Sequence, residues 1–303
     1  MIITIVACAA SVAGWLNRCG WLFDLVSHFR VQCAAVLLFG AVVLSLTHRH
    51  ALLAVVAAGG VLVQLSAVLP LYRWRGPHVS HEEKSLRVVF ANVWWFNHAY
   101  QRIARFLKEA AADIVVLEEI SEQGLTALKQ HGLEYPFSKM AVRSDAFCMV
   151  LLSRLPLEEA TSISLGVAGV PSIVARVRVG STRLTLMATH PWSPMTRQHA
   201  AWRNEQLERL AEFAAQQEGP VMLVGDLNTT SWTAVFRRFL RRSRLRDSRQ
   251  GFGMQPSWPA FVPLLRIPID HCLVSAEVAV RRRVLGPAIG SDHLPVVVDV
   301  AVA

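Results

Sequence analysis

Residues 221–228 read Val-Met-Leu-Val-Gly-Asp-Leu-Asn, a short apolar run that ends in an acid and an amide. Four apolar residues followed by a glycine are typical of a buried strand. Polar side chains that follow such a strand lie at the edge of the sheet where α/β domains place their sites. Asp226 and Asn228 would, taken alone, equally suit an ordinary turn. The stretch therefore predicts a covered β-sheet and makes its carboxyl edge the first place to look for a site.

The same arrangement occurs twice more along the chain. The apolar run Asp113–Ile120 ends in Glu118 and Glu119, and Asp292 and His293 directly precede a last apolar run. A single carboxylate after a strand is often only a helix cap, but three such strand ends are harder to explain by chance. We therefore expect these side chains to gather at one edge of the fold.

The remaining pattern from residue 86 onward alternates strand-like and helix-like segments. Such alternation indicates an α/β or α+β domain with at least one fully covered sheet. The predicted helices are Gln101–Ala112, Glu122–Gln130, Arg197–Ala215 and Ser231–Leu240. The predicted strands are Leu86–Val93, Asp113–Ile120, Phe147–Ser153, Ser172–Val179, Arg183–Thr189, Val221–Gly225, Ile269–Val274 and Val296–Val302.

The amino-terminal quarter of the chain has a different composition. The 303 residues are 53% hydrophobic, and the apolar residues concentrate in three runs, Met1–Leu16, Val31–Thr47 and Ala51–Tyr72. A helix needs about 20 apolar residues to cross a bilayer. We therefore expect a membrane anchor of two or three transmembrane helices in residues 1–75, a linker in residues 76–85, and a catalytic domain in residues 86–303. The first run would also suit a signal peptide.

Basic residues near the ends of the spans predict the orientation of the anchor. With three spans, Arg18 and Arg30 share a side with Arg73, whereas Arg49 lies on the other side. Short cytoplasmic loops carry the excess of Lys and Arg. We therefore expect a multi-pass protein of the bacterial inner membrane with its catalytic domain in the cytoplasm.

The charge balance favours an anionic partner. The net charge is +9, and seven arginines lie between Arg237 and Arg249. Such a run suits a nucleic acid backbone or anionic lipid headgroups, and it suits a solvated helix face equally well. Cys148 and Cys272 have neither disulfide-framework nor zinc spacing, which argues against a structural zinc site.

Seven short motifs in a fixed order carry a resemblance to a known family. They contain Asn92, Glu119, the Ser-Arg-Leu-Pro of residues 153–156, His190, Asp226 with Asn228, Asp270, and Asp292 with His293. In this order the chain resembles the endonuclease/exonuclease/phosphatase superfamily, which includes DNase I-like and exonuclease III-like enzymes, inositol polyphosphate phosphatases and neutral sphingomyelinases. The resemblance covers residues 86–302.

The resemblance implies a fold and a set of roles. The fold would be a four-layer α/β sandwich, two packed β-sheets flanked by helices. Metal ligands would be Asn92, Glu119 and Asp292, holding Mg²⁺, with Mn²⁺ as an alternative, in keeping with the preference of these cations for oxygen ligands. Catalytic residues would be His190, Asp226, Asn228, Asp270 and His293. Substrate-binding residues would be Trp94, Arg154 and Arg197.

Two positions depart from the better-known members. Val93, Trp94 and Trp95 stand where exonuclease III-like enzymes carry an acid, so Asn97 or His98 would have to replace it. The Gln-Glu pair of the metal-binding strand is Glu118-Glu119 here, and side chains alternate along a strand, so we expect Glu118 to face away from the metal.

The sequence thus predicts a membrane-anchored, magnesium-dependent hydrolase of a phosphodiester or phosphomonoester. Its substrate would be a nucleic acid or a phospholipid, because the basic charge suits the first and the anchor favours the second. The alternatives are a sphingomyelinase-like membrane-lipid phosphodiesterase and a non-catalytic membrane scaffold that retains the fold.

Overall fold

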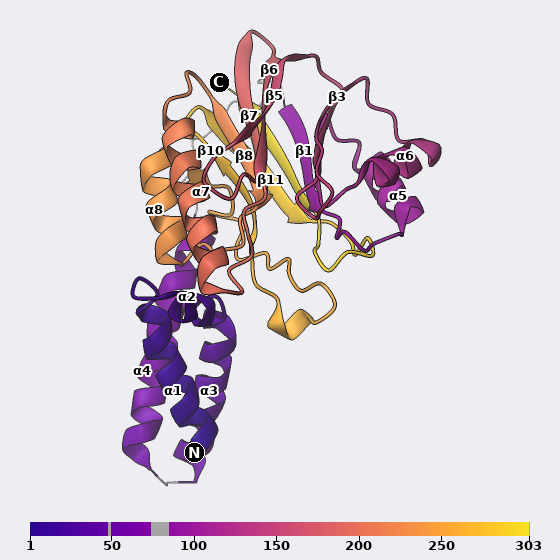
Figure 1. Ribbon diagram of the computed structural model, residues 1–303. Helices are drawn as coiled ribbons and strands as arrows, with labels where there is room; N and C mark the ends of the chain where they lie inside the picture. Colours follow the sequence, from indigo (N-terminus) through magenta and orange to yellow (C-terminus); the bar gives the residue numbers. More distant parts are fainter. Residues whose placement is uncertain (48–49, 74–84, 303) are drawn as a thin grey trace.

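Two six-stranded sheets pack face to face at the centre of the C-terminal domain (Figure 1). The computed structural model describes residues 1–47, 50–73 and 85–302, so the predicted linker falls outside these residues except for Ser85. The strand order is β11-β12-β1-β2-β4-β3 in the first sheet and β5-β6-β7-β8-β10-β9 in the second. The strands are β1 (Ser85–Asn92), β2 (Ile114–Glu118), β3 (Phe137–Ala141), β4 (Met149–Ser153), β5 (Leu157–Ser164), β6 (Pro171–Val179), β7 (Thr182–Thr189), β8 (Val221–Asp226), β9 (Arg246–Asp247), β10 (Asp270–Val274), β11 (Val278–Leu285) and β12 (Val296–Val302).

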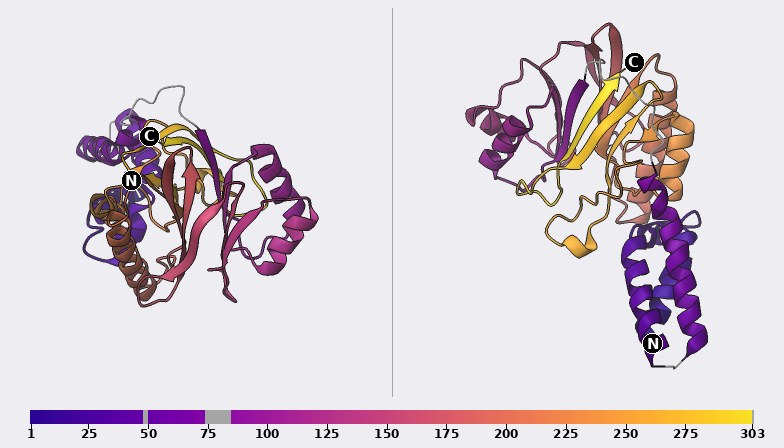
Figure 2. Two further views of the ribbon diagram at one scale, coloured as in Figure 1. Left: turned by 90° about the horizontal axis from the view of Figure 1, so that it is seen from above. Right: turned by 180° about the vertical axis from the view of Figure 1, so that it is seen from behind.

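Helices cover the outer face of each sheet, so the domain has four layers (Figure 2). One pair of helices packs on the first sheet and the other pair on the second. The two faces of β1 illustrate the packing: Val88 and Phe90 point between the sheets, while Val89 and Ala91 point toward the helices. This architecture confirms the predicted sandwich. The helices are α5 (Tyr100–Ala110) and α6 (Glu122–Gln130) on the first sheet, and α7 (Arg197–Ala215) and α8 (Ala234–Ser243) on the second.

Some elements differ from the prediction, each for a local reason. Strands β3 and β5 are largely exposed and carry polar side chains, so they lack the apolar runs by which strands were sought. Strand β11 was missed because it contains three consecutive arginines, residues 281–283. The helix predicted at Ser231–Leu240 begins later, because Thr233 caps it: the Thr233 side chain accepts a hydrogen bond from the Phe236 N–H.

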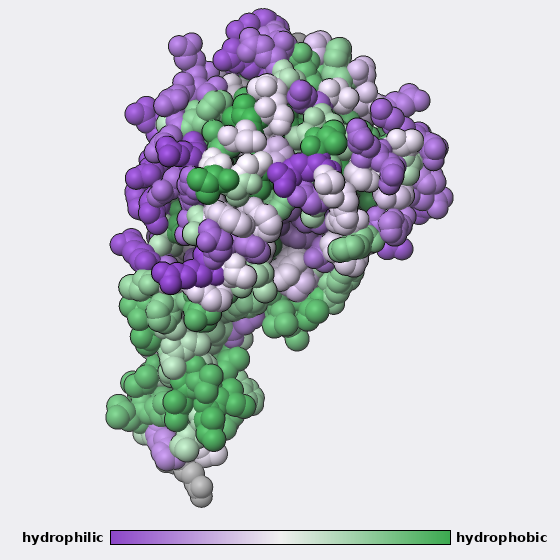
Figure 3. All heavy atoms as spheres, in the orientation of Figure 1, coloured by the Kyte–Doolittle hydropathy of each residue, from purple (hydrophilic) through white to green (hydrophobic). Residues whose placement is uncertain are grey.

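The N-terminal residues form a bundle of helices below the domain (Figure 1). Small residues such as Ala7, Ala41 and Ala57 occupy its centre, whereas large apolar side chains such as Phe39 and Leu52 point outward. Figure 3 shows the resulting apolar surface as a green column under a largely polar domain. The helices are α1 (Ile2–Trp15), α2 (Trp21–Ser27), α3 (Arg30–Leu46) and α4 (Ala51–Val68), followed by the 3₁₀ turn η1 (Leu69–Tyr72).

Among the described residues, one helix is long and apolar enough to cross a membrane. It is the 22-residue segment Ala51–Tyr72. Helices α2 and α3 would count as a second if they form one span, but they meet at a bend of 66°. Helix α1 is apolar but shorter. The three predicted apolar runs thus all fold as helices, and their placement in a membrane remains a prediction.

Buried polar contacts join the bundle to the domain. Arg203 of α7 donates through Nη2 to the Asp24 carboxylate of α2 at 2.5 Å, and both side chains are buried. The Trp232 indole N–H donates to the Ser27 carbonyl at 2.7 Å, and His28 lies 3.3 Å from the Thr230 hydroxyl. These contacts place α2 directly beside the segment that follows β8.

Candidate active site

The strand register brings the predicted site residues to one end of both sheets. Asp226 closes β8 and pairs with Asp270 at the start of β10, while Asn92 closes β1 beside Glu118 of β2. Gly225 permits the close approach of β8 to its neighbour, because a Cβ at this position would collide with the Thr189 carbonyl. The glycine in the opening motif therefore has a packing role.

A cavity of about 530 Å³ opens at this end of the sheets. Seven of the predicted site residues line it, and two more stand directly behind them. Asn92 is hydrogen-bonded to one lining residue and Asp270 to another. The lining residues from the prediction are Trp94, Glu119, His190, Asp226, Asn228, Asp292 and His293.

Glu119 is held in place by groups of the first sheet. Its carboxylate accepts a hydrogen bond from Asn92 Nδ2 at 2.8 Å and another from the Trp95 N–H at 2.9 Å. The backbone of Glu119 adopts a left-handed conformation with φ of 57°, which is unusual for a residue with a side chain. Such strain persists only where neighbours enforce it and is frequent at functional sites.

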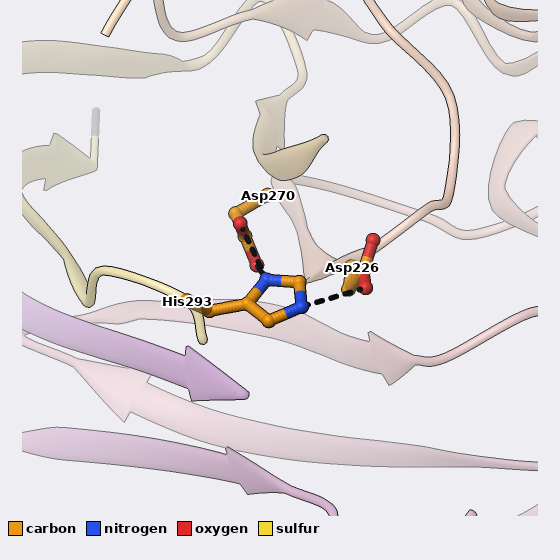
Figure 4. Close-up of side chains that lie close together, drawn as sticks. All are labelled: Asp226, Asp270 and His293. Atoms are coloured by element: carbon orange, nitrogen blue, oxygen red, sulfur yellow. Dashed lines mark hydrogen bonds and ion pairs between the residues drawn. The ribbon is translucent and has the colours of Figure 1, made fainter. Parts of the chain in front are cut away.

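His293 lies between two carboxylates, as Figure 4 shows. Its Nδ1 is 2.9 Å from Asp270 Oδ2, and its Nε2 is 3.7 Å from Asp226 Oδ2. Burial by itself lowers the pKa of His293, but the negative charge and hydrogen bond of Asp270 outweigh it and raise the pKa to about 10. At neutral pH the imidazole therefore carries a positive charge beside Asp226.

Asp226 is buried, and its surroundings change the pKa of its carboxyl group. Burial raises the pKa of Asp226 to about 8, although the charge of His293 pulls in the opposite direction. The Asn228 N–H donates to Asp226 Oδ1 at 2.9 Å, and Asn228 Nδ2 donates to the Pro191 carbonyl at 3.0 Å. The fixed orientation of this carboxyl group, beside the imidazole of His293, suits it to proton transfer with a reacting group.

His190 faces the same carboxylates from the β7 side. Its Nε2 lies 3.8 Å from Asp226 Oδ2 and 3.9 Å from Glu119 Oε1. Burial lowers the pKa of His190, partly opposed by the negative charge of Glu119. The two histidines thus have opposite tendencies, with His293 charged and His190 inclined to be neutral.

Glu118 does not line the cavity and lies buried between the sheets. Its Oε2 accepts a hydrogen bond from the Asp226 N–H at 3.1 Å. Burial, together with the charge of Asp226, raises the pKa of Glu118 well above its ordinary value. Glu118 therefore supports the backbone of Asp226 from behind.

The oxygen atoms of Glu119 and Asp292 fit a hard divalent cation. Asp292 accepts a hydrogen bond from the Trp258 indole N–H at 3.0 Å through Oδ2, while its buried Oδ1 has no hydrogen-bond partner among the described residues. A second group, Asp226, Asp270 and His293, has donor atoms within 4.8 Å of one another. In that group the imidazole ring lies between the acids, which suits proton transfer better than shared coordination (Figure 4).

Several predicted residues lie away from this cavity. Arg154 was expected to bind substrate, but its guanidinium lies 5.7 Å from the Tyr135 ring centroid and lines a different hollow beside Lys108. Arg197 is exposed at the start of α7 and is not part of the cavity lining. Asn97 does not replace the missing acid, because its side chain bonds to the Val93 and Ile289 carbonyls, and His98 lines a different hollow from the site cavity.

Other lining residues were missed by the sequence analysis. Trp258 bonds to Asp292 from a loop that carries no recognisable motif. The bundle contributes Leu25, His28 and Phe29, which lie more than 60 residues before Asn92 in the sequence. No local signal marks these bundle residues, because they reach the site only through the docking of α2.

Comparisons with known proteins agree with this geometry. The sequence model described as "Endonuclease/Exonuclease/phosphatase family" matches residues 89–293, which contain every motif of the cavity. No curated protein sequence matches the chain.

Solved structures share the fold at low sequence identity. A humanized D. rerio TDP2 is 18% identical with a TM-score of 0.60, covering 71% of this chain and 98% of its own. D. rerio TDP2 complexed with a single strand DNA product is 17% identical with a TM-score of 0.60, covering 72% and 99%. An endonuclease/exonuclease/phosphatase from Beutenbergia cavernae is 19% identical with a TM-score of 0.58, covering 73% and 72%.

Proposed function

Because the chain belongs to the Endonuclease/Exonuclease/phosphatase family, we propose that it is a membrane-anchored, magnesium-dependent hydrolase of a phosphodiester bond. The observation that carries this proposal is the convergence of Glu119, Asp226 and His293 on one cavity from three separate segments. A structural relative, D. rerio TDP2, is complexed with a single strand DNA product, which supports a phosphodiester as the bond that is cut.

Glu119 and Asp292 would hold the cation, with Mg²⁺ as our expectation and Mn²⁺ as the alternative. When bound, the ion supplies positive charge that offsets the negative charge building on the phosphoryl oxygens. Asn92 is a positioning residue in this scheme, because its amide group already bonds to Glu119 and to the Trp94 N–H.

The remaining residues move protons and hold the phosphate. Asp226 accepts a proton from water as the water oxygen bonds to phosphorus, and the bond between phosphorus and the leaving alcohol oxygen breaks. Asn228 fixes the Asp226 carboxylate for this step. His293, kept charged by Asp270, donates to a phosphate oxygen, and His190 stabilises the developing charge from the β7 side.

We further propose that the bundle spans a membrane. Large apolar side chains such as Phe39 and Leu52 face outward, while Ala7, Ala41 and Ala57 pack around Leu37 at its centre, and such small residues at helix contacts are expected where lipid is the solvent. The expected cytoplasmic position of the domain is checked by protease treatment of intact cells: a cytoplasmic domain resists cleavage until the membrane is permeabilised.

Chelation and one substitution test the proposed activity. The full chain, purified in detergent, is expected to hydrolyse the soluble diester bis(4-nitrophenyl) phosphate with Mg²⁺ or Mn²⁺ and to stop when EDTA is added. Asp226→Ala is expected to lower turnover by about 10²- to 10⁴-fold, because the proton acceptor is lost. Asp299→Asn is the matched control, since Asp299 pairs with Arg87 outside the cavity.

The proposal fails if no phosphodiester is turned over in a chelator-sensitive way. It also fails if Asp226→Ala hydrolyses the diester at the same rate as the parent protein and the Asp299→Asn control. A scaffold that keeps the fold without catalysis would give the first of these results.

A further inference from the structure

The bundle supplies one wall of the site cavity. Leu25 of α2 lines the cavity, and so do His28 and Phe29 at the bend between α2 and α3. His28 is fixed there by its contact with the Thr230 hydroxyl. A hydrolase that acted only on a water-soluble phosphodiester would not need apolar side chains of its anchor beside Asp226.

A second apolar element projects from the domain on the same side as the bundle. It is the loop of residues 258–267, visible as the orange loop beside the bundle in Figure 1 and as a green projection in Figure 3. Four large side chains of this loop are exposed, Leu264 at 87%: Phe261, Val262, Leu264 and Leu265. The same loop contributes Trp258 and Ile267 to the cavity lining.

The loop is fastened to the bundle. Gln32 of α3 donates through Nε2 to the Leu264 carbonyl at 3.2 Å and to the Arg266 carbonyl at 3.1 Å. These two hydrogen bonds therefore hold the exposed side chains in a fixed position beside the first turn of α3. Apolar surface held next to a lipid-facing bundle is suited to insertion into the same bilayer.

Basic side chains lie where the bundle meets the domain, which is where we expect the surface of the bilayer. Burial lowers the pKa of Arg237 on α8, and the positive charges of nearby Arg18 and Arg241 lower it further. Arg18 belongs to the loop between α1 and α2, so this group lies where the bundle meets the domain. Clustered arginines at such a level attract anionic headgroups.

The rest of the arginine run lies mostly on the surface of the domain, away from the cavity. Arg238 and Arg242 form exposed ion pairs with Glu208 of α7, and Arg249 is buried against Asp247. The described residues that line the cavity include no Lys or Arg. The cavity wall therefore offers no basic side chain to the backbone of a nucleic acid, which disfavours a nucleic acid as the partner.

We propose that the substrate is a phosphodiester in the headgroup of a bilayer phospholipid, whose acyl chains leave the cavity between Phe29 of the bundle and the 258–267 loop. This inference rests on the proposed hydrolase function and specifies its substrate class. Water attacks phosphorus, one ester bond of the headgroup breaks, and a phosphomonoester and an alcohol are formed.

The experiment compares a lipid with a soluble diester in one preparation. The full chain is reconstituted into vesicles of phosphatidylglycerol and phosphatidylethanolamine with Mg²⁺. Loss of each phospholipid is followed by mass spectrometry, and bis(4-nitrophenyl) phosphate is added to the same vesicles. We expect loss of phospholipid that stops with EDTA and with Asp226→Ala.

Substitutions in the loop separate the two substrates. Leu264→Glu is expected to slow phospholipid turnover by about tenfold or more, since a charged side chain no longer enters the bilayer. Turnover of the soluble diester is expected to stay unchanged, which also shows that the variant is folded. Leu264→Met is the matched control and should behave as the parent, and Phe261→Gln is a second, independent test of the loop.

The outcomes distinguish the two proposals. If the soluble diester is hydrolysed but phospholipid is untouched, the substrate inference is wrong and the hydrolase function stands. The same conclusion follows if single-stranded DNA is cut in place of lipid, or if Leu264→Glu and Phe261→Gln leave lipid turnover at the parental rate. If neither lipid, DNA nor soluble diester is hydrolysed, both proposals fail.

Discussion

The N-terminal bundle and the C-terminal domain differ in where they place their large apolar side chains. In the domain, large apolar residues such as Phe90 and Leu186 fill the space between the sheets. In the bundle, small or polar residues such as Thr4 and Gly40 lie inside, and large apolar ones such as Phe39 face outward. Water drives apolar groups inward, whereas lipid exerts no such force between helices and leaves close packing of small residues to hold them.

The interface between the bundle and the domain differs from the interior of either region. It combines buried polar pairs, among them Asp24 with Arg203 and Ser27 with Trp232, with an apolar cluster in which Val68 and Leu71 pack against Trp232. Arg203 also donates to the Asn228 carbonyl at 2.8 Å, so Asp24 of the bundle is linked through Arg203 to the candidate site. Through this interface the bundle forms part of the site. Because the bundle, the domain and their interface are packed differently, we expect substitutions in them to have different effects.

The largest expected effect comes from breaking the polar contact. Asp24→Ala leaves the Arg203 guanidinium buried without its ion-pair partner, and loss of one partner of a buried pair typically costs about 3–5 kcal/mol. We expect the free energy of unfolding in detergent, followed by denaturant titration, to fall by this amount. Arg87→Met, which removes a half-exposed pair with Asp299, is the control and should cost about 1 kcal/mol or less. Equal losses in the two variants would contradict the importance of the interface.

A smaller effect should follow from enlarging the centre of the bundle. A Cβ on Gly40 would collide with the Thr4 side chain of α1, whereas a Cβ on Gly59 would meet nothing within 4 Å. Gly40→Ala is therefore expected to destabilise the bundle by about 1–3 kcal/mol. Gly59→Ala should be neutral or stabilising, because alanine favours helix. Thermal unfolding in detergent compares the two variants, and the packing argument is wrong if they are alike.

The smallest effect concerns a histidine in the interior of the domain. Burial, with the charge of Arg249, lowers the pKa of His271 to about 3, so the folded protein keeps this imidazole neutral. The unfolded chain binds the proton near pH 6.5, so stability is full above that value and declines as the pH falls toward 3. At pH 5.5 the parent should have lost about 1 kcal/mol relative to pH 7.

His271→Asn is the comparison for this pH dependence. The variant cannot bind the proton, so its free energy of unfolding should change less between pH 7 and pH 5.5. Parallel curves for the two proteins would show that another group governs acid sensitivity.

Strand patterns were predictable where both faces of a strand are covered. Strand β8 begins with a continuous apolar run and β12 is apolar except for Asp299, because helices or the other sheet contact each face. Strand β5 was not predictable in this way, since it is largely exposed at a sheet edge. The helix at Arg197–Ala215 was predicted with its observed bounds, whereas the start of α8 was displaced by the Thr233 cap.

The sequence by itself determined the sandwich fold and the set of acids, amides and histidines at the strand ends. Strand periodicity predicted only an α/β or α+β domain with a covered sheet, and the family resemblance carried by the order of the motifs implied the sandwich. Only the tertiary structure decided that Arg154 lies over Tyr135, that Glu118 supports Asp226 from behind, and that Phe29 of the bundle lines the cavity. These relations depend on how distant segments pack, and the docking of α2 against α7 leaves no pattern in the residues around Asp226.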